Sequence, residues 1–343
     1  MKIGLVGFAG SGKSTVFRWL TGVAPDPARV QQGQIGTAKL PDPRVDQMAA
    51  IFKPKKTVYA EIAFLDTPGL DLAERRDNPR RLGILRESDG LVVVLNGYAG
   101  GNLADELRRF RDELIFADLE ILTNRLSKVE ANLKKPKPAK EREADESERA
   151  ILQRLIATLE SGQMPRALGL KPEEEKAVRS FQLLTLKPEI VFVNQGEAGQ
   201  ALPADLLALA PDALAAPAQL ELELEELAPE DRAAFAADLG LTGSQRDDIL
   251  RRIFTAMGQI VFITVGEDEC RAWPIPKGAD AVQGAAQIHT DLAKRFVRAE
   301  VVAYDDFLKA GSMKEAKAQG VYRLEGKTYV VQDGDIMHIL ASS

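Results

Sequence analysis

Cysteine and histidine are scarce in this sequence. Its 343 residues include one cysteine, Cys270, and two histidines, His289 and His338. A single cysteine cannot form an internal disulfide, which excludes a disulfide-stapled secreted fold and indicates a reducing compartment. No cluster of cysteine or histidine surrounds either histidine, so we interpret both as structural residues rather than as metal ligands.

Long apolar runs and an excess of positive charge are also missing. No apolar run approaches the ~20 residues of a membrane-spanning helix. The net charge is −6, from 45 basic and 51 acidic residues, so there is no global electrostatic footprint for nucleic acid. The chain enters its first predicted strand at once, without a signal-peptide pattern. We therefore expect a cytoplasmic protein without a membrane or DNA partner, in which any RNA partner would have to meet a local basic patch.

The clearest functional motif lies at the start of the chain. The apolar run 3–6 leads into a glycine-rich turn that ends in Lys13 and Ser14, and a helical pattern follows up to Leu20. Strand, glycine-rich loop and helix in this order are typical of a Walker A motif. Backbone amides and the helix N-terminus are expected to hold the phosphates, with Lys13 on the β- and γ-phosphates and Ser14 on Mg²⁺. The predicted contacts to ATP or GTP are Ala9, Gly10, Ser11, Gly12, Lys13, Ser14 and Thr15.

A second motif follows the alternating segment 59–65. Asp66 and Gly69 form an Asp-x-x-Gly sequence at the predicted end of this strand, where a Walker B acid belongs. Asp66 is expected to hold the Mg²⁺ shell, and the Gly69 N–H to sense the γ-phosphate. We therefore predict Lys13, Asp66 and Gly69 as catalytic residues, and Ser14 and Asp66 as metal ligands.

A third strand end bears on the choice of base. The apolar strand 189–193 ends in Asn194-Gln195-Gly196-Glu197, where GTPases carry Asn-Lys-x-Asp. The aspartate of that motif accepts the ring N–H and exocyclic amine of guanine, and adenine offers neither donor on that edge. With Glu197 in place of aspartate, the guanine clamp is altered. We predict Asn194 and Glu197 as base contacts, although a plain strand–loop junction would have the same pattern.

Two basic segments have a structural and a functional interpretation. Residues 71–88 contain five arginines, which form either a solvated helix or a contact for RNA or a phosphate. Apolar residues spaced by three and four over 103–133 and again over 152–159 predict an antiparallel helical hairpin. Its lysine-rich tip is either solvated or a probe for RNA. The arginines are Arg75, Arg76, Arg80, Arg81 and Arg86, and the tip lysines are Lys134, Lys135, Lys137 and Lys140.

These segments predict an α/β protein of three parts. Residues 1–102 and 163–258 are expected to form a P-loop domain with a mostly parallel sheet and helices on both faces. The hairpin insertion covers 103–162. Short strands around a helix in 259–343 suggest a β-grasp module.

Over nearly its whole length the chain resembles the YchF / Obg-like ATPase family. The most specific likeness lies in 41–47, 183–188, Asn194 with Glu197, and several C-terminal runs. The resemblance implies a cytosolic ATPase that uses GTP more weakly, associates with ribosomes, and carries a C-terminal TGS domain that flanks an RNA-binding groove together with the helical arm. It further implies that Leu70 replaces the usual catalytic glutamine, and that Tyr98 lies near the base. The C-terminal runs are 271–273, 288–291, 298–301, 304–307 and 332–338.

The catalytic segments depart from the family pattern, which indicates a divergent member. Gly10 stands where the family has asparagine, and Val30 where a switch threonine reaches Mg²⁺. The second switch is arginine-rich instead of glycine-rich, and a histidine-containing loop is shortened to 99–102. No side chain is an obvious positioner of the attacking water, so we expect slow turnover. The alternatives are a nucleotide-loaded RNA or protein adaptor that scarcely hydrolyses, and a GTP-specific GTPase.

Overall fold

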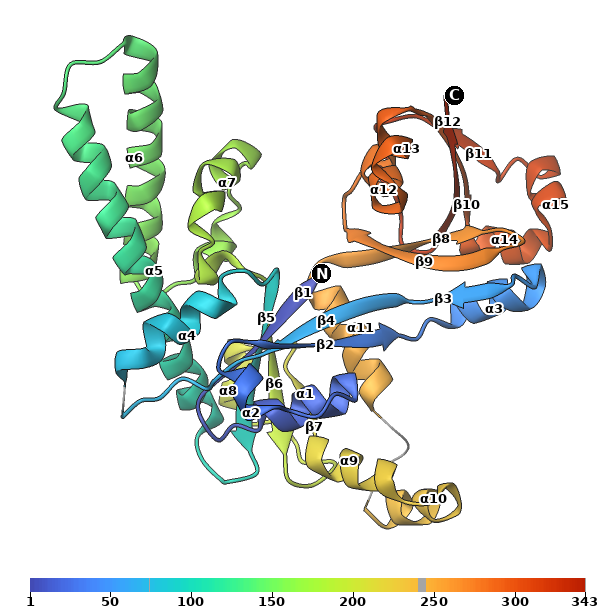
Figure 1. The fold of residues 1–343 in the computed structure, drawn as a ribbon, viewed down its shortest axis with the longest axis horizontal. Helices are drawn as coiled ribbons and strands as arrows, with labels where there is room; N and C mark the ends of the chain where they lie inside the picture. The colour runs from blue at the N-terminus through green and yellow to red at the C-terminus, as the bar shows by residue number, and fades with distance from the viewer. Residues whose placement is uncertain (74, 240–244, 343) are drawn as a thin grey trace. The chain divides into compact units, whose positions relative to one another are not determined.

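The computed structural model describes residues 1–73, 75–239 and 245–342 (Figure 1). They form two compact units, Met1–Gly36 with Ala63–Gln245, and Thr37–Ile62 with Arg246–Ser343. These units group the chain differently from the three predicted domains, because residues 37–62 belong with the C-terminal part and the hairpin belongs with the phosphate-binding part. Residues 240–244 of the predicted segment 163–258, and Ser343 of the predicted C-terminal module, lie outside the described residues.

A six-stranded sheet organises the first unit, in the order β2-β4-β1-β5-β6-β7. β1 pairs in parallel with β4 and β5, and β6 pairs in parallel with β5 and β7. Because these strands run in the same direction, their carboxyl ends lie at one edge of the sheet. The strands are β1 (Lys2–Val6), β2 (Gln34–Leu40), β4 (Ala60–Asp66), β5 (Gly90–Gly97), β6 (Glu189–Gln195) and β7 (Leu214–Ala216), and β2 and β4 each contain residues of both units.

Helices cover both faces of this sheet. Leu91, Val93 and Leu95 of β5 pack in one apolar cluster with side chains of α4, α5 and α8. On the opposite face, Trp19 of α1 lies 6.0 Å from Phe192 of β6. Alternate residues of each strand therefore meet different helices, as expected for a sheet buried on both sides. The helices of this unit, apart from the hairpin, are α1 (Lys13–Thr21), α2 (Pro27–Val30), α4 (Asn78–Leu85), α7 (Pro172–Val178), α8 (Ala204–Leu209), α9 (Ala218–Glu226) and α10 (Pro229–Asp238).

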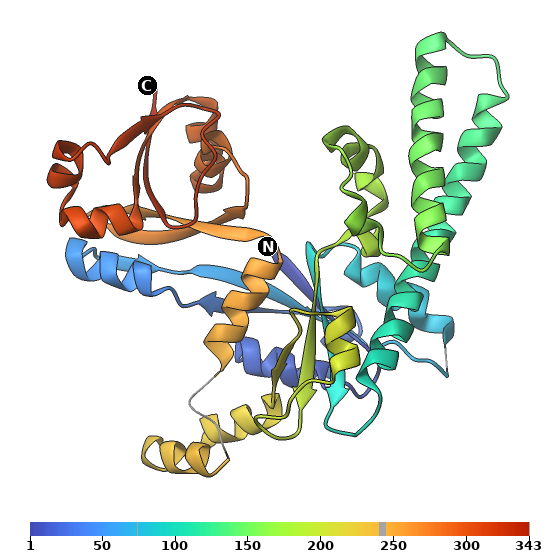
Figure 2. The same ribbon diagram turned by 180° about the vertical axis from the view of Figure 1, so that it is seen from behind.

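The predicted hairpin is present. α5 (Leu103–Leu133) and α6 (Ala139–Glu160) lie side by side, and residues 134–138 join them at the tip (Figures 1 and 2). Buried leucines and valine from both helices share one apolar cluster. Arg125 of α5 binds both carboxylate oxygens of Glu148 of α6, at 2.6 and 2.8 Å. The proline-containing break between the apolar repeats thus marks the turn correctly.

The second unit is a mixed six-stranded sheet in the order β11-β10-β12-β8-β9-β3. α12 packs on one face of it through a shared apolar core (Figure 2). Its strands are β3 (Lys56–Val58), β8 (Gln259–Val265), β9 (Glu269–Pro276), β10 (Phe296–Ala303), β11 (Arg323–Glu325) and β12 (Asp335–Ala341). Its helices are α3 (Pro43–Phe52), α11 (Arg246–Ala256), α12 (Ala281–Ile288), α13 (Thr290–Lys294), α14 (Tyr304–Ala310) and α15 (Met313–Ala318). The predicted fold class is confirmed.

One detail of this unit differs from expectation. The helix expected within 259–343 is two helices, α12 and α13, because His289 is extended, with φ −163° and ψ 138°, and its ring caps α13. A single extended residue ends one helix and starts the next. Among the helices of the described residues, none is both long enough and apolar enough to cross a bilayer.

Candidate nucleotide site

Strand register brings the three predicted motifs to one edge of the first sheet. Leu5 of β1 is level with Asp66 of β4, so the loop after β1 lies beside the Asp-x-x-Gly segment. Asn96 of β5 is level with Asn194 of β6. Four strands thus deliver a glycine-rich loop, an acid and two amides to the carboxyl edge, which is where open α/β sheets bind ligands.

The phosphate loop, residues 7–14, depends on glycine at position 12. Gly12 has φ +83° and is the N-cap of α1. A Cβ built there would lie 2.1 Å from Nδ2 of Asn194. Both the left-handed backbone and the close amide exclude other residues. Ala9, Gly10 and Ser11 lie in this loop and Thr15 in the first turn of α1, and their contact with a nucleotide stays a prediction.

Lys13 is buried at the bottom of the loop. Its side chain donates a hydrogen bond of 2.8 Å to the Phe8 carbonyl oxygen. Burial lowers the pKa of Lys13 to about 8; Asp66 and Glu106 counteract the shift, and the charge of Arg81 adds to it. A buried ammonium bound to a neutral carbonyl is ready to exchange this partner for a phosphate.

Asp66 and Ser14 have the chemistry of a magnesium site. Asp66 is fully buried, and neither carboxylate oxygen has a hydrogen-bond partner of ordinary geometry among the described residues. Burial raises the pKa of Asp66, while the nearby Ser14 hydroxyl and the Lys13 charge lower it. A buried carboxylate without a partner is costly unless a cation compensates it. A carboxylate and a hydroxyl are oxygen ligands that suit Mg²⁺, so these two residues fit that ion.

The Asp-x-x-Gly segment lies directly on the phosphate loop. The Leu70 N–H donates to the Gly7 carbonyl at 3.0 Å, and the Ala9 N–H donates to the Leu70 carbonyl at 2.9 Å. A Cβ on Gly69 would lie 2.5 Å from the Ala9 nitrogen and 2.7 Å from Nζ of Lys13. Only glycine can approach the loop this closely. Leu70 itself is 2% exposed, so its side chain packs inward.

Two of the predicted base contacts, Asn194 and Tyr98, lie against the phosphate loop. Asn194 is buried and its Nδ2 lies 3.5 Å from the Ser11 carbonyl. The Tyr98 hydroxyl donates to the Gly10 carbonyl. Glu197 is exposed on the loop after β6. Asn194 and Tyr98 therefore brace the phosphate loop, whereas the contact of the exposed Glu197 with a base stays a prediction.

Sequence reasoning missed two residues at this site. Asn96 donates from Nδ2 to the Gly10 carbonyl at 3.2 Å. Glu106 accepts the Asn96 N–H at 3.2 and 3.3 Å; burial raises its pKa, which the Asn96 N–H and Lys13 counteract. Neither belongs to a motif. The only signal was position, because Asn96 ends a buried strand as Asp66 and Asn194 do.

The arginine-rich segment is largely engaged within the unit. Arg75 pairs with Glu113 at 3.3 Å, and Arg86 pairs with buried Asp118 at 2.7 Å. Arg81 donates to the Gly69 carbonyl at 2.7 Å. The segment is thus neither a uniformly solvated face nor a free basic patch.

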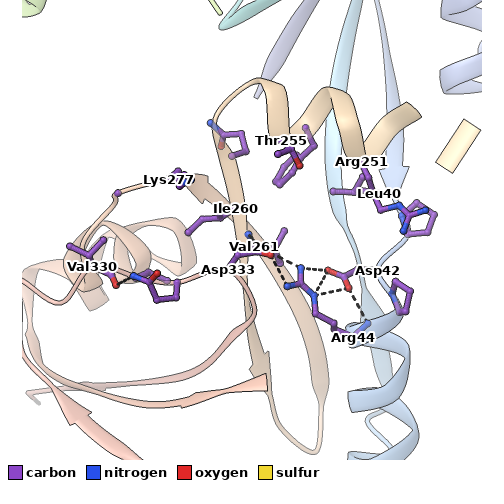
Figure 3. A pocket seen from close by; sticks show the side chains of 17 residues that line it. Leu40, Asp42, Arg44, Arg251, Thr255, Ile260, Val261, Lys277, Val330 and Asp333 are labelled. Carbon is purple, nitrogen blue, oxygen red and sulfur yellow. Dashed lines mark hydrogen bonds and ion pairs between the residues drawn. The ribbon is translucent and has the colours of Figure 1, made fainter. Parts of the chain in front are cut away.

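Two cavities are candidates for the nucleotide site. One of about 330 Å³ borders the phosphate loop and is lined by Phe8, Ala9, Glu106 and residues 99–102. Another, of about 720 Å³, lies in the second unit, where Arg44 binds Asp42 and Asp333 above an apolar wall (Figure 3). Burial lowers the pKa of Arg44, but hydrogen bonds to the two aspartates outweigh it and raise the pKa above its ordinary value. The second cavity contains no glycine-rich loop, so the nucleotide site is assigned to the first unit.

The described residues contain no group of three or more His, Cys, Asp or Glu side chains arranged to hold a metal ion. His289 caps a helix, and His338 pairs with Glu300 at 2.8 Å. Their assignment as structural residues agrees with these contacts. A Mg²⁺ ion at Asp66 and Ser14 would need nucleotide oxygens or water for its remaining ligands, as is usual for this ion.

Family models and full-length relatives match this chain. A family model described as "50S ribosome-binding GTPase" matches residues 2–125, and a YchF GTPase C-terminal model, described as a protein of unknown function, matches residues 259–342. The ribosome-binding ATPase YchF of Haemophilus influenzae is 32% identical over 98% of this chain and 98% of its own. The protein of the same name from Bacillus subtilis is 31% identical over 98% of this chain and 97% of its own.

Solved structures agree in fold. The YchF GTPase of Schizosaccharomyces pombe has a TM-score of 0.78 and 26% identity, with 99% of this chain and 97% of that chain covered. A GTP-binding protein from Pyrococcus horikoshii, 18% identical with a TM-score of 0.58 over both full chains, shares the fold. Because full-length relatives, both family models and the phosphate-loop geometry coincide, the chain belongs to the YchF family of P-loop NTPases.

Proposed function

We propose that this protein binds a nucleoside triphosphate with Mg²⁺ and hydrolyses it to the diphosphate and phosphate, with ATP preferred over GTP. The observation that carries the proposal is the buried Asp66 carboxylate, which has no hydrogen-bond partner of ordinary geometry among the described residues and lies beside Ser14 and Lys13 at the glycine-rich loop. Lys13 and the loop amides would hold the phosphates. Mg²⁺ would neutralise charge that develops in the transition state.

The proposed preference for adenine rests on the strand end that carries Asn194 and Glu197, because Glu197 stands where GTPases carry the aspartate that reads guanine. The Oδ1 of Asn194 is buried and has no hydrogen-bond partner among the described residues, while Nδ2 faces the Ser11 carbonyl. An oxygen acceptor complements the exocyclic amine of adenine, whereas guanine carries an oxygen at the same ring position. The longer side chain of Glu197, in place of that aspartate, further weakens a guanine clamp.

We further propose that the nucleotide state sets association with the ribosome in the cytoplasm. The relatives named as ribosome-binding ATPases support this partner. RNA contact would involve the hairpin and the C-terminal module. Lys137 at the tip is paired with Asp145, so the remaining tip lysines would carry it. Neither a membrane nor DNA is part of the proposal.

The test compares ATP and GTP in one experiment. Nucleotide-free protein is titrated calorimetrically with Mg²⁺ and non-hydrolysable ATP and GTP analogues, and turnover is measured beside a Lys13→Ala control. Tighter ATP binding by roughly tenfold, about 1.4 kcal/mol, supports the adenine assignment. Tighter binding of the GTP analogue would contradict the adenine assignment and indicate a GTPase. Turnover no faster than that of Lys13→Ala, with and without ribosomes, would leave a nucleotide-loaded adaptor instead.

A further inference from the structure

One arginine of the 71–88 segment, Arg81, is bound to the Asp-x-x-Gly segment. Arg75 and Arg86 pair with the carboxylates Glu113 and Asp118. Arg81, on α4, instead donates from Nη1 to the backbone carbonyl of Gly69 at 2.7 Å. Its positive charge therefore has a neutral acceptor, and this acceptor belongs to the Asp-x-x-Gly segment.

This contact holds Arg81 beside the phosphate loop. Gly69 lies against Ala9 and Lys13, because a Cβ on it would be 2.7 Å from Nζ of Lys13. The Lys13 pKa, lowered chiefly by burial, is lowered further by the nearby charge of Arg81. Two positive side chains thus lie near the predicted γ-phosphate position.

Both cations are bound to carbonyl oxygens that a phosphate can replace. Lys13 donates to the Phe8 carbonyl at 2.8 Å, as Arg81 does to Gly69. Hydrogen bonds from a cation to an anionic oxygen are about twice as strong as those between neutral groups. Guanidinium carries five donors in a planar fork, so Arg81 can also keep one contact to Gly69 while it binds a phosphate oxygen.

We propose that Arg81 is a catalytic arginine supplied by the chain itself, which contacts the γ-phosphoryl group and stabilises its transition state. This inference rests on the proposed hydrolysis. In that step the water oxygen forms a bond to the γ-phosphorus, and the bond from phosphorus to the bridging oxygen breaks. The bond's electron pair leaves with the diphosphate, and the proton of the water passes to the released phosphate. Arg81 keeps its own proton throughout and compensates charge on the equatorial oxygens.

The proposal explains how hydrolysis could proceed when Leu70 stands in place of the usual catalytic glutamine. A hydrophobic side chain, buried as Leu70 is, cannot orient a water. Catalysis then depends on charge stabilisation, and arginine residues placed in this way accelerate phosphoryl transfer by roughly 10³- to 10⁵-fold in other NTPases.

The test uses full-length protein and three variants. Arg81→Ala removes the side chain. Arg81→Gln keeps an N–H donor for the Gly69 carbonyl without the charge. Arg80→Ala is the matched control, because Arg80 is the exposed neighbour on the same helix. Single-turnover hydrolysis of Mg·ATP, affinity for a non-hydrolysable ATP analogue, and affinity for Mg·ADP with aluminium fluoride are measured for each.

We expect Arg81→Ala and Arg81→Gln to slow hydrolysis by about 100-fold or more. Both should lose the tightening of ADP binding by aluminium fluoride, with affinity for the ATP analogue within about threefold of the parent. Arg80→Ala should match the parent. Full activity of Arg81→Gln, or parental rates in both Arg81 variants, overturns the inference and leaves the proposed function intact. A parent protein no faster than Lys13→Ala overturns both.

Discussion

At the scale of single residues, the phosphate loop depends on two close approaches of backbone. Gly12 lies against Asn194, and Gly69 lies against Ala9 and Lys13. A side chain at either position would push apart the segments that must contact the same nucleotide. The absence of a side chain at Gly12 and Gly69 allows these close contacts. Hydrogen bonds from Asn96 and Tyr98 to the Gly10 carbonyl hold the loop in addition.

The first prediction concerns Gly12→Ala. We expect the free energy of unfolding to fall by more than the ~1–2 kcal/mol that a left-handed alanine costs, because the new Cβ also meets the Asn194 amide. Affinity for nucleotide should fall by roughly tenfold or more, since the loop amides are displaced. Urea unfolding and calorimetric titration measure the two effects.

Gly22→Ala is the matched control for this prediction. Gly22 has φ +72° at the other end of α1, and a Cβ there meets open space. The Gly22→Ala substitution should lower the free energy of unfolding only by the cost of the left-handed backbone and should leave nucleotide affinity unchanged. Equal losses of stability and affinity in the two variants would contradict the role given to the Asn194 contact.

At the scale of elements, a buried ion pair connects the hairpin to the core of its unit. Asp118 of α5 is fully buried; it binds Arg86 at 2.7 Å and accepts both the N–H and the hydroxyl of Thr185 at 2.8 Å. Its carboxylate therefore joins three segments that are distant in the sequence. The hairpin is anchored by charge at its base and by apolar packing along its length.

The second prediction follows from this anchor. Asp118→Ala leaves the Arg86 guanidinium without its partner and should reduce the free energy of unfolding by about 3–5 kcal/mol. Asp112→Ala, an exposed change on the same helix, should stay within about 0.5 kcal/mol of the parent. Urea denaturation followed by circular dichroism measures both, and similar values for the two variants would refute the anchor.

The third prediction concerns pH and the buried thiol of Cys270 in the second sheet. Burial raises the pKa of Cys270 on β9 from 9.0 to about 11, and the charges of Glu269 and Asp46 add to the rise. Between about pH 9 and 11 the unfolded thiol loses its proton while the folded one keeps it. Stability should therefore fall as pH rises through this window, by at most about 1.4 kcal/mol for each pH unit from this group.

Comparison with Cys270→Ala isolates this contribution. Tyrosines also titrate in the window, but they are the same in both proteins. We expect the difference in free energy of unfolding between parent and variant to shrink from pH 8 to pH 11. Two curves that remain parallel would show that the thiol does not contribute.

At the scale of the whole molecule, the second unit is built from two separate parts of the chain. β3 adds to the sheet in parallel with β9, and Phe52 of α3 stacks on Phe307 of α14 at 5.6 Å. Arg44 pairs with Asp333, 289 residues away. The insert 37–62 thus supplies an edge strand, a covering helix and an ion pair to the C-terminal sheet.

The fourth prediction tests this dependence. A fragment of residues 246–343 should melt at a lower temperature than the same fragment joined by a flexible linker to residues 37–62, because it exposes Phe307 and the β9 edge. Thermal unfolding by circular dichroism compares them. Phe52→Ala in the joined fragment should remove part of the gain, and equal melting temperatures for all three would contradict the prediction.

Local patterns were enough to predict the elements that carry the chemistry. The phosphate loop, Asp66 at a strand end and the helical hairpin are each encoded by neighbours in sequence, through glycine spacing, alternation and a three–four apolar repeat. The fold class follows from their order along the chain. The two-helix break at His289 was missed, because a single extended residue leaves no trace in an apolar repeat.

Only the tertiary structure decided which distant groups meet. Strand register placed Asn96 at the nucleotide site, and the first turn of α5 brought Glu106 to the Asn96 N–H. The position of α4 brought one of five similar arginines to Gly69. The tertiary structure also assigned residues 37–62 to the C-terminal sheet. Sequence alone determined the local elements and the motif chemistry, since these depend on residues a few positions apart. Contacts between residues tens to hundreds of positions apart depend on how the elements pack, and a local sequence pattern does not predict that packing.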